Sequence, residues 1–322
     1  MIAIITGVSG QDGYYTAMNL IDRGVNVVGL TTDIARARDV YKSVEEGRIE
    51  IIECDYSDVR ELRDIIESSK PSMIFNFAAM SSGQAMFDDP VLINRLNSIL
   101  PLNLMEAIRL SSESLNISFV QASSSEMYGD VDVPVQNENT PFRPKSPYGA
   151  AKLYAHNMVS IYRNYYGIRC SSAILFNHES SRRTAQFVTK KIARSAARIK
   201  MKLDSSLSLG SIESQRDWGY APDYCDAMIR MAISEYPADY VISTGKLFSV
   251  RDLLQIAFDY VGLDYSRFVA VDYSVLRKVE SKKHCGDSSK IQKHLGWSPT
   301  MGVKEVMQKM VEHELEAIKL SI

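Results

Sequence analysis

The sequence predicts an α/β protein with a doubly wound parallel sheet and a smaller C-terminal substrate-binding domain. Three observations support this. Short buried apolar runs alternate with amphipathic segments through the first half, a Gly-rich turn follows the first run, and the regular alternation ends near residue 178. Parallel strands need long, usually helical, right-handed crossovers, so this alternation favours strands in one sheet with helices on both faces.

The predicted strands are short and almost continuously apolar, which is typical of strands covered on both faces. They are Ile2–Thr6, Val25–Leu30, Ile49–Cys54, Met73–Phe77, Ile117–Gln121 and Ile168–Leu175. The segments between them show helical spacing, for example Tyr14–Arg23, Val59–Ser68 and Pro101–Leu110. A further strand is predicted at Tyr240–Ser243, after a helix at about Ala221–Ser234.

The second half has basic helices and short apolar pieces instead. Phe187–Lys202 and Val303–Leu320 are predicted helices, and Ser249 to Asp252 open another with a start that resembles a capping box. We expect a sheet domain at 1–177, with a returning segment at about 217–245, and a smaller domain formed mainly by 178–322. No repeat or obvious linker separates them, so they should pack tightly.

Composition excludes several classes of protein. The 322 residues carry a formal net charge of -2, whereas a general nucleic-acid binder is usually basic. No apolar run approaches the ~20 residues of a membrane-spanning helix, and we expect the first residues to form a buried strand rather than a signal peptide. Scattered cysteines without ligand spacing indicate reduced thiols, a cytoplasmic protein and no metal site.

A Gly-rich turn, Gly7 to Gly13 in the pattern GxxGxxG, joins the first strand to the first helix. Glycines there permit a tight turn and let backbone amides approach a pyrophosphate at the helix end. The position in a βαβ pattern therefore predicts a dinucleotide site. The residues expected to contact the dinucleotide at this edge are Gly7, Ser9, Gly10, Gln11, Asp12, Gly13, Asp55, Tyr56, Phe77, Ala78, Ala79 and Ser81.

The residues after the second strand give a mixed indication of which dinucleotide binds. An acid at the strand end would bind a ribose 2′-hydroxyl, and an arginine would accept a 2′-phosphate. Asp33 lies slightly beyond the expected acid position, and Arg36 and Arg38 follow it closely. We expect NADP, bound through Arg36 or Arg38, with NAD as the competing interpretation.

Tyr148 and Lys152 are four residues apart, which places them on one face of a helix. A phenol with its usual pKa of about 10 is a poor base at neutral pH. We expect the neighbouring ammonium and a cationic nicotinamide to lower the pKa of Tyr148, and Lys152 to hold the nicotinamide ribose. The run Ser123 to Glu126 follows the fifth strand and would bring a hydroxyl and a carboxylate to the same site.

Together these motifs resemble the extended short-chain dehydrogenase/reductase superfamily, which has a Rossmann fold, and within it the GDP-mannose 4,6-dehydratases. The resemblance covers nearly the whole chain. It depends on the strings Gly7–Gly13, Gln121–Gly129, Ser146–Tyr154, Leu175–Ser180, Phe187–Lys191 and Arg216–Gly219. Glu126 matters most among these residues, because sugar-nucleotide epimerases lack a carboxylate at that position.

The resemblance implies an NADP(H)-dependent hydro-lyase that converts GDP-mannose to GDP-4-keto-6-deoxy-mannose. Tyr148 would take the C4-hydroxyl proton while hydride leaves C4 for the nicotinamide. Glu126 would remove the C5 proton and protonate the departing C6 hydroxyl, after which the hydride returns to C6. Ser124 stands where the family has a threonine and would bond the C4 oxygen. The cycle is redox-neutral.

The resemblance also implies positions for binding residues. Those expected around the nucleotide diphosphate are Asn177, Val188, Lys191, Arg216, Arg277 and Glu280. His178 would lie beside the nicotinamide, and Arg183 near a cofactor, that of its own or a neighbouring subunit, in a homodimer or homotetramer. His156, His284, His294 and His313 match no motif and are interpreted as structural or surface residues.

Three departures from the family pattern leave alternatives open. Small residues, Ser82 and Gly83, occupy a sugar-facing loop and would leave space near C6, so GDP-D-glycero-D-manno-heptose is an alternative substrate. Thr32 and Asp33 replace paired arginines, and Arg277 to Glu280 replace an Arg-Pro-type turn. A nucleotide-sugar epimerase or reductase, which needs only the Tyr–Lys pair and a hydroxyl, is the further alternative.

Overall fold

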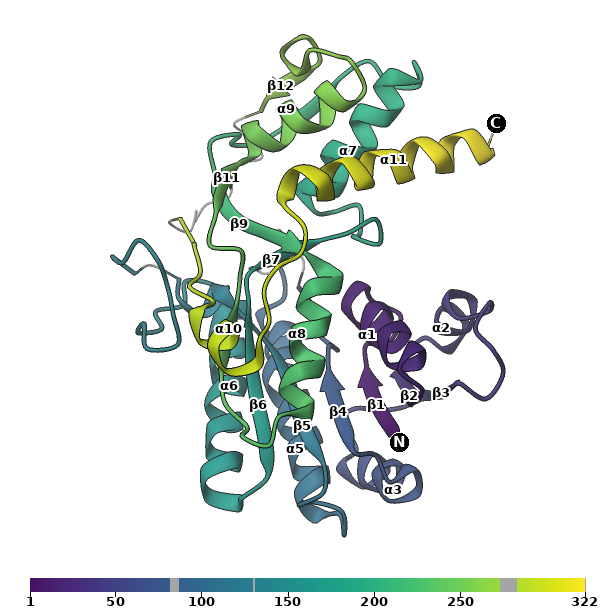
Figure 1. Ribbon diagram of the computed structural model, residues 1–322, viewed down its shortest axis with the longest axis vertical. Coiled ribbons are helices and arrows are strands. Elements are labelled where there is room, and N and C mark those ends of the chain that lie inside the picture. Colours follow the sequence, from purple (N-terminus) through teal and green to yellow (C-terminus); the bar gives the residue numbers. More distant parts are fainter. Residues whose placement is uncertain (82–86, 130, 273–282, 322) are drawn as a thin grey trace.

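A seven-stranded parallel sheet organises the computed structural model (Figure 1), which describes residues 1–81, 87–129, 131–272 and 283–321. The spatial order is β10-β6-β5-β4-β1-β2-β3. The strands are β1 (Ile2–Thr6), β2 (Asn26–Thr31), β3 (Ile49–Glu53), β4 (Met73–Asn76), β5 (Ser118–Ser124), β6 (Arg169–Leu175) and β10 (Tyr240–Ile242). The order reverses between β1 and β4, and ligands of such sheets bind beside the carboxyl ends at this reversal. The predicted doubly wound sheet is confirmed.

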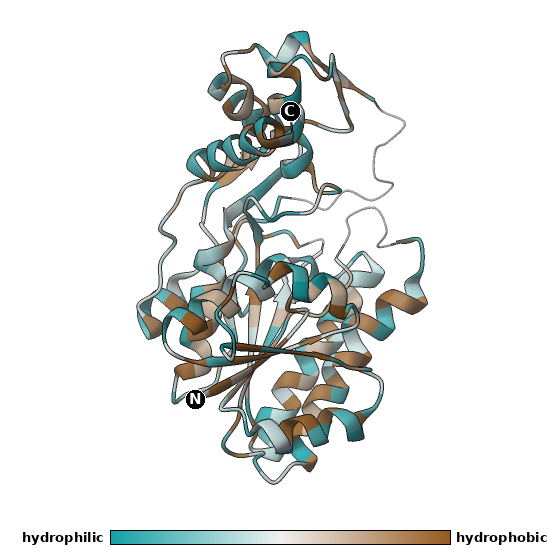
Figure 2. Cartoon of the chain, turned by 90° about the vertical axis from the view of Figure 1, so that its right-hand side faces the viewer, coloured by the Kyte–Doolittle hydropathy of each residue, from teal (hydrophilic) through white to brown (hydrophobic). Residues whose placement is uncertain are grey.

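Helices cover both faces of the sheet, because alternate strand residues point to opposite faces. On one face lie α1 (Gln11–Asp22), α2 (Ile34–Val40), α8 (Ala221–Ile233) and α10 (Ser289–Leu295). On the other lie α3 (Val59–Ser69), α5 (Leu100–Leu110) and α6 (Pro147–Tyr166). Neighbouring β1 residues serve different cores, Ile5 the first and Ile4 the second. The helices carry hydrophobic and hydrophilic patches (Figure 2), as amphipathic packing requires.

The smaller half has its own hydrophobic core around Trp218. Its helices are α7 (Val188–Lys200), α9 (Val250–Tyr260) and α11 (Val303–Ser321), with a 3₁₀ turn η4 (Tyr265–Arg267). Its strands form a three-stranded sheet of β7 (Asn177–Glu179), β9 (Gln215–Tyr220) and β11 (Leu247–Ser249), and a pair of β8 (Leu207–Leu209) and β12 (Val269–Val271). The capping box predicted at Ser249 and Asp252 is present.

Buried carboxylates join the two halves. Asp217 on β9 is fully buried and accepts hydrogen bonds from the backbone of Thr244, Gly245 and Gly286. Asp223, in the first turn of α8, accepts from the amide and hydroxyl of Thr300. These contacts hold the chain where it crosses between the sheet and the smaller half, as the expected tight packing requires.

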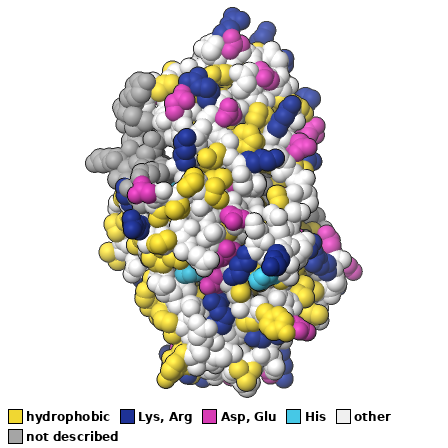
Figure 3. All heavy atoms as spheres, turned by 60° about the vertical axis from the view of Figure 1, so that its left-hand side comes forward, with side chains coloured by type: hydrophobic (Ala, Val, Ile, Leu, Met, Phe, Trp, Pro, Cys, Tyr) yellow, Lys and Arg dark blue, Asp and Glu magenta, His cyan; other side chains and the backbone are white. Residues whose placement is uncertain are grey.

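On the face in Figure 3, basic and acidic side chains are interspersed, and neither sign covers it alone. In the part of the chain that the structure describes, no helix is long and apolar enough to cross a membrane. The same residues include no cluster of three or more potential His, Cys, Asp or Glu metal ligands.

Candidate active site

The Gly-rich turn forms a cradle at the carboxyl end of β1. Gly7 has φ +62°, and the Gly10 amide donates to its carbonyl at 2.9 Å. A Cβ on Gly13 would lie 2.4 Å from the Gly7 oxygen, and one on Gly7 would lie 2.8 Å from the Ala78 nitrogen, so neither tolerates a side chain. Gly10 is the N-cap of α1 and provides no side-chain cap. The first-turn amides therefore fit a dinucleotide pyrophosphate.

The other predicted cofactor residues follow neighbouring strands at this edge. Ser9 and Phe77 are half-buried, whereas Asp55, Ala79 and Ser81 are exposed. Hydrogen bonds from Ser57 hold the pKa of the exposed Asp55 below its usual value. Tyr56 is buried in the core beneath α5, and burial raises its pKa. Its ring is thus part of the wall of this edge rather than an exposed contact.

The loop after β2 is organised by Asp33. Its carboxylate caps α2 by accepting the Arg36 amide at 3.0 Å, and its own amide bonds the Thr31 hydroxyl at 3.0 Å. Arg36 and Arg38 are exposed on α2. The acid expected to bind a ribose 2′-hydroxyl thus caps its own helix, while the side chains of both arginines are exposed to solvent.

Two sequence strings that lie far apart, Gln11–Asp12 and His178–Ser180, form a polar clasp. The Gln11 side-chain Nε2 donates to the His178 backbone carbonyl at 3.2 Å, and the Ser180 hydroxyl donates to the Gln11 side-chain Oε1 at 2.7 Å. The His178 Nε2 lies 3.0 Å from the Asp12 carboxylate. Burial is the largest single influence and disfavours the charged form of both groups. The charge–charge attraction between them and their hydrogen bonds together outweigh it, so the pKa of His178 is raised and that of Asp12 is lowered. The clasp ties α1 to β7.

Loss of the ion pair in the clasp is expected to destabilise the protein in a pH-dependent way. Because the folded pKa of His178 is raised, its stabilisation is complete below the unfolded pKa of about 6.5 and lost as pH rises through the folded value. His178→Gln should reduce the free energy of unfolding by roughly 1.5–3 kcal/mol near pH 6 and by less at alkaline pH. Urea denaturation of the cofactor-free protein measures this, with the exposed His313→Gln as control; a deficit independent of pH contradicts it.

The Tyr224 ring packs against the His178 imidazole. The two rings stack with centroids 4.7 Å apart, and a Cβ on Gly219 would lie 2.3 Å from the Tyr224 ring. Gly219 ends the string that begins at Arg216, whose guanidinium donates to the Gln215 carbonyl at 2.7 Å. Part of this string therefore has a packing role, which its resemblance to family motifs did not reveal.

The four predicted catalytic residues come from the end of β5 and the start of α6. Ser124 ends β5 and accepts the Glu126 amide at 3.2 Å, which begins the 3₁₀ turn η3 (Ser125–Met127). Tyr148 and Lys152 lie one helical turn apart on α6. A Cβ on Gly149 would lie 2.6 Å from the Glu126 carbonyl, so glycine allows α6 to contact η3. This close approach brings the four together.

Burial controls the ionisation of the Tyr–Lys pair. It raises the pKa of Tyr148 to about 12, an effect that the Glu126 charge reinforces and the Ser124 hydrogen bond opposes. It lowers the pKa of Lys152 to about 8. The expectation that a neighbouring ammonium lowers the pKa of Tyr148 is therefore wrong for the protein by itself. The Lys152 ammonium lies 5.7 Å from the centre of the phenol ring and donates to the Ala122 carbonyl at 2.8 Å instead.

Sequence reasoning missed a buried polar chain that leads to Lys152. The Thr6 hydroxyl donates to Asn76 at 2.6 Å, Asn76 donates to Gln121 at 2.7 Å, and Gln121 donates to the Ala122 carbonyl at 2.8 Å. The same carbonyl accepts from Lys152. Only the adjacency of β1, β4 and β5 brings these residues together. Polar residues at the ends of apolar strands were the available signal.

Arg183 and three of the predicted diphosphate residues, Asn177, Val188 and Lys191, belong to the described part of the smaller half. The Arg183 side chain pairs with Glu179 at 3.1 Å and covers the Phe187 ring. Its charge contributes to the lowered pKa of Asp12 and opposes the burial that raises the pKa of Tyr148. Asn177 is half-buried on β7, and Val188 begins α7. The Lys191 ammonium donates to the Ser208 carbonyl at 2.7 Å. Ser82, Arg277 and Glu280 lie outside the described residues.

Comparisons with known proteins agree with this site. A profile of the family described as GDP-mannose 4,6 dehydratase matches residues 4–310. The chain is 38% identical to GDP-mannose 4,6 dehydratase 1 of Arabidopsis thaliana, over 99% of the chain and 91% of that protein. It is 36% identical to the GDP-mannose 4,6-dehydratase of Sinorhizobium fredii, over 99% and 97%.

A solved structure supports the fold. The UDP-glucose 4-epimerase of Thermus thermophilus, in complex with NAD, superimposes with a TM-score of 0.84 and 26% identity, over 98% of this chain and 99% of that one. The neighbours are extended short-chain dehydrogenase/reductase enzymes, as the motifs predicted. Because the family profile and these relatives extend over nearly the whole chain, the protein belongs to the GDP-mannose 4,6-dehydratase family.

Proposed function

We propose that the protein converts GDP-mannose to GDP-4-keto-6-deoxy-mannose on a bound nicotinamide cofactor. The observation that best supports the proposal is the close contact of η3 with α6: the Glu126 amide donates to the Ser124 hydroxyl, and the Glu126 charge raises the pKa of Tyr148. A carboxylate next to the Tyr–Lys pair is what water elimination needs in addition to oxidation. The family match over residues 4–310 gives further support.

In this proposal each side chain moves or holds a proton at a stated atom. Tyr148 accepts the C4-hydroxyl proton, with the C4 oxygen held by Ser124. Glu126 then removes the C5 proton, which the C4 ketone acidifies, and protonates the departing C6 hydroxyl. When the hydride returns to C6, C5 takes up a proton, and this balances the proton that Tyr148 accepted from the C4 hydroxyl. The nicotinamide, when bound, supplies temporary storage of the hydride that leaves C4 and returns to C6. The Ser124 hydrogen bond and the Arg183 charge favour the phenolate of Tyr148, and the cationic nicotinamide ring, when bound, would add to their effect.

The test is incubation of the purified protein with GDP-mannose, followed by mass spectrometry of the product. The expected product is lighter than the substrate by one water, and no external nicotinamide is consumed. GDP-D-glycero-D-manno-heptose is included in the panel, although nothing in the comparisons favours it and its basis, Ser82, is outside the described residues. Epimerisation or reduction without loss of water would overturn the proposal.

We propose NADP as the cofactor, bound through Arg36 or Arg38, with NAD as the alternative. The capping role of Asp33 and the exposure of both arginines support this choice. The Arg36→Glu, Arg38→Glu double variant should weaken NADPH binding by at least roughly tenfold and NADH binding much less, because a 2′-phosphate needs a cationic partner. Fluorescence titration measures both affinities, with the exposed Arg267→Glu as control; an equal loss for both cofactors contradicts the assignment.

We also propose the division of labour between the two halves. Residues 1–177, with a returning segment at about 217–245, would bind the dinucleotide, and 178–322 would mainly bind the GDP-sugar. Separate hydrophobic cores support this division. Proteins with substitutions confined to α7 should then lose affinity for GDP and keep affinity for NADP.

Assembly and cellular location complete the proposal. We propose a homodimer or homotetramer, which is supported by exposed apolar side chains on α6, including Ile161 at 47% and Tyr165 at 80% exposure. Light scattering after size-exclusion chromatography decides the stoichiometry.

We propose a cytoplasmic location, because all four cysteines are buried and unbridged, as expected in a reducing compartment.

A further inference from the structure

A second row of buried polar groups lies on the side of the sheet that α6 covers. Toward the amino ends of the strands this side is apolar, with Phe119 and Cys170 in the core beneath α5 and α6. Toward the carboxyl ends it carries Ser123 and Ser172, which are 3% and 0% exposed. Two buried hydroxyls at the end of an apolar face need hydrogen-bond partners.

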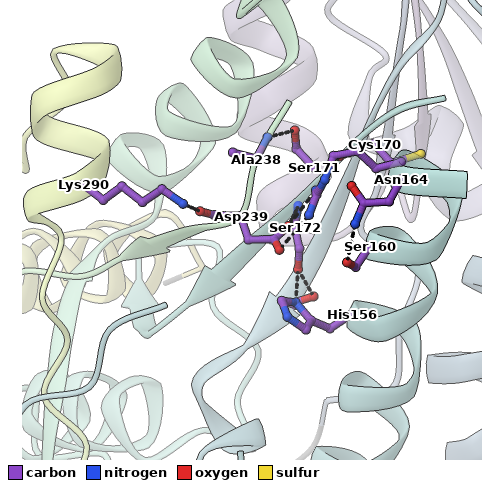
Figure 4. Close-up of polar contacts among 11 residues, drawn as sticks. His156, Ser160, Asn164, Cys170, Ser171, Ser172, Ala238, Asp239 and Lys290 are labelled. Atoms are coloured by element: carbon purple, nitrogen blue, oxygen red, sulfur yellow. Dashed lines mark hydrogen bonds and ion pairs between the residues drawn. The ribbon is translucent and has the colours of Figure 1, made fainter. Parts of the chain in front are cut away.

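His156 on α6 completes this row. Its Nδ1 lies 2.7 Å from the Ser172 hydroxyl, which in turn lies 2.7 Å from the Ser123 hydroxyl (Figure 4). The imidazole is 8% exposed and packs edge-on against Phe142, with centroids 5.0 Å apart. His156 lies four residues after Lys152 and eight after Tyr148, so it extends the face of α6 that carries the Tyr–Lys pair.

Ser172 is a rigid anchor for this row. Its amide donates to the Asp239 carboxylate at 3.2 Å, and the Arg163 guanidinium holds that carboxylate through two bonds of 2.9 Å. With the backbone fixed, the remaining freedom of Ser172 is the direction of its hydroxyl. The imidazole of His156 sets that direction. The Asp239 carboxylate bonds Arg163, whereas the imidazole bonds Ser172, and the serine is fully buried, so the Ser–His pair is not a nucleophile and its base.

Ser123 lies between the two β5 residues on which the proposed chemistry depends. The carbonyl of Ala122, on one side, accepts from Lys152. On the other side, Ser124 provides the hydroxyl that bonds Tyr148. Successive strand residues point to opposite faces, so fixing Ser123 on the α6 side fixes the rotation of β5 that presents Ser124.

We propose that His156 is a positioning residue that acts through Ser172 and Ser123 to hold Ser124 in place for the reaction. The proposal goes beyond the interpretation of His156 as a structural or surface residue. The inference rests on the proposed function, because the role of Ser124 toward the C4 oxygen belongs to that proposal. Its test therefore includes a measurement that does not need turnover.

The experiment compares His156→Phe, which removes the hydrogen bond but keeps a ring against Phe142, with His156→Asn, whose amide reaches the position of Nδ1. Ser172→Ala interrupts the row at its centre and serves if the phenylalanine variant does not fold. The Phe and Ala variants should each lower kcat for GDP-mannose by about tenfold, the effect of one hydrogen bond. KM should stay within about twofold, because the row acts on Ser124 and not on the nucleotide. His156→Asn should recover most of kcat.

A double-mutant cycle separates positioning from general damage. In a Ser124→Ala background, His156→Phe should cause no further loss of kcat, because the residue through which it acts is gone. The exposed His313→Phe is the matched control and should behave like the parent protein. Independent losses that multiply in the double variant would overturn the proposal.

Amide hydrogen exchange of residues 118–127 gives the measurement without turnover. Exchange should be faster in His156→Phe and Ser172→Ala than in the parent, and close to the parent rate in His156→Asn. If the parent protein does not act on GDP-mannose, the proposed function fails and this exchange comparison decides the positioning role. Parent-like exchange in His156→Phe overturns the positioning role, as does parent-like kcat where the parent is active.

Discussion

Glu126→Gln is expected to abolish the loss of water from GDP-mannose while cofactor binding is kept. The amide has the shape of the carboxylate but cannot take the C5 proton or return it to the departing hydroxyl. Loss of one positioned acid–base group typically lowers the rate 10²–10⁴-fold, so dehydration should fall by about that factor. Oxidation at C4 does not need Glu126, and the substitution also removes a negative charge that raises the pKa of Tyr148.

Two signals measure this outcome together. Mass spectrometry should find dehydrated sugar nucleotide formed at a rate lower by about 10²–10⁴-fold, and absorbance should show reduced nicotinamide persisting after substrate is added. The exposed Glu50→Gln on β3 removes the same charge far from the site and should keep parent activity. Full dehydration by Glu126→Gln would remove Glu126 from the mechanism and leave the carboxylate without a role.

Tyr148→Phe is expected to block the reaction one step earlier. The phenol oxygen is the proposed acceptor of the C4-hydroxyl proton, and no other side chain is assigned that role, so turnover should fall by about 10²–10⁴-fold. The ring itself packs with Ile93 and Met80, and phenylalanine keeps that packing. The fold and the affinity for the cofactor should therefore change little.

The spectroscopic signature distinguishes this variant from Glu126→Gln. Neither reduced nicotinamide nor dehydrated product should appear, because hydride does not leave C4 until its hydroxyl proton has an acceptor. Tyr154→Phe is the matched control, since Tyr154 lies on the same helix and is 40% exposed. Formation of reduced nicotinamide at the parent rate would show that another group accepts the proton.

Local patterns predicted most of the fold. The expected strand at Ile2–Thr6 and the expected helix at Val59–Ser68 agree with the structure to within a residue, because apolar runs and helical spacing are properties of neighbouring residues. The fifth strand extends beyond its expected end to Ser124, since pairing with β6 continues through polar serines. Hydropathy alone did not indicate that pairing.

The sequence by itself determined the sheet, the Gly-rich turn and the pairing of Tyr148 with Lys152 on one helix face, because each depends on spacing along a short stretch of chain. Only the tertiary structure decided that Asp12 bonds His178 and that His156 reaches Ser172, because these partners come from elements far apart in the sequence. The same is true of the raised pKa of Tyr148, since its desolvation depends on everything packed around the ring.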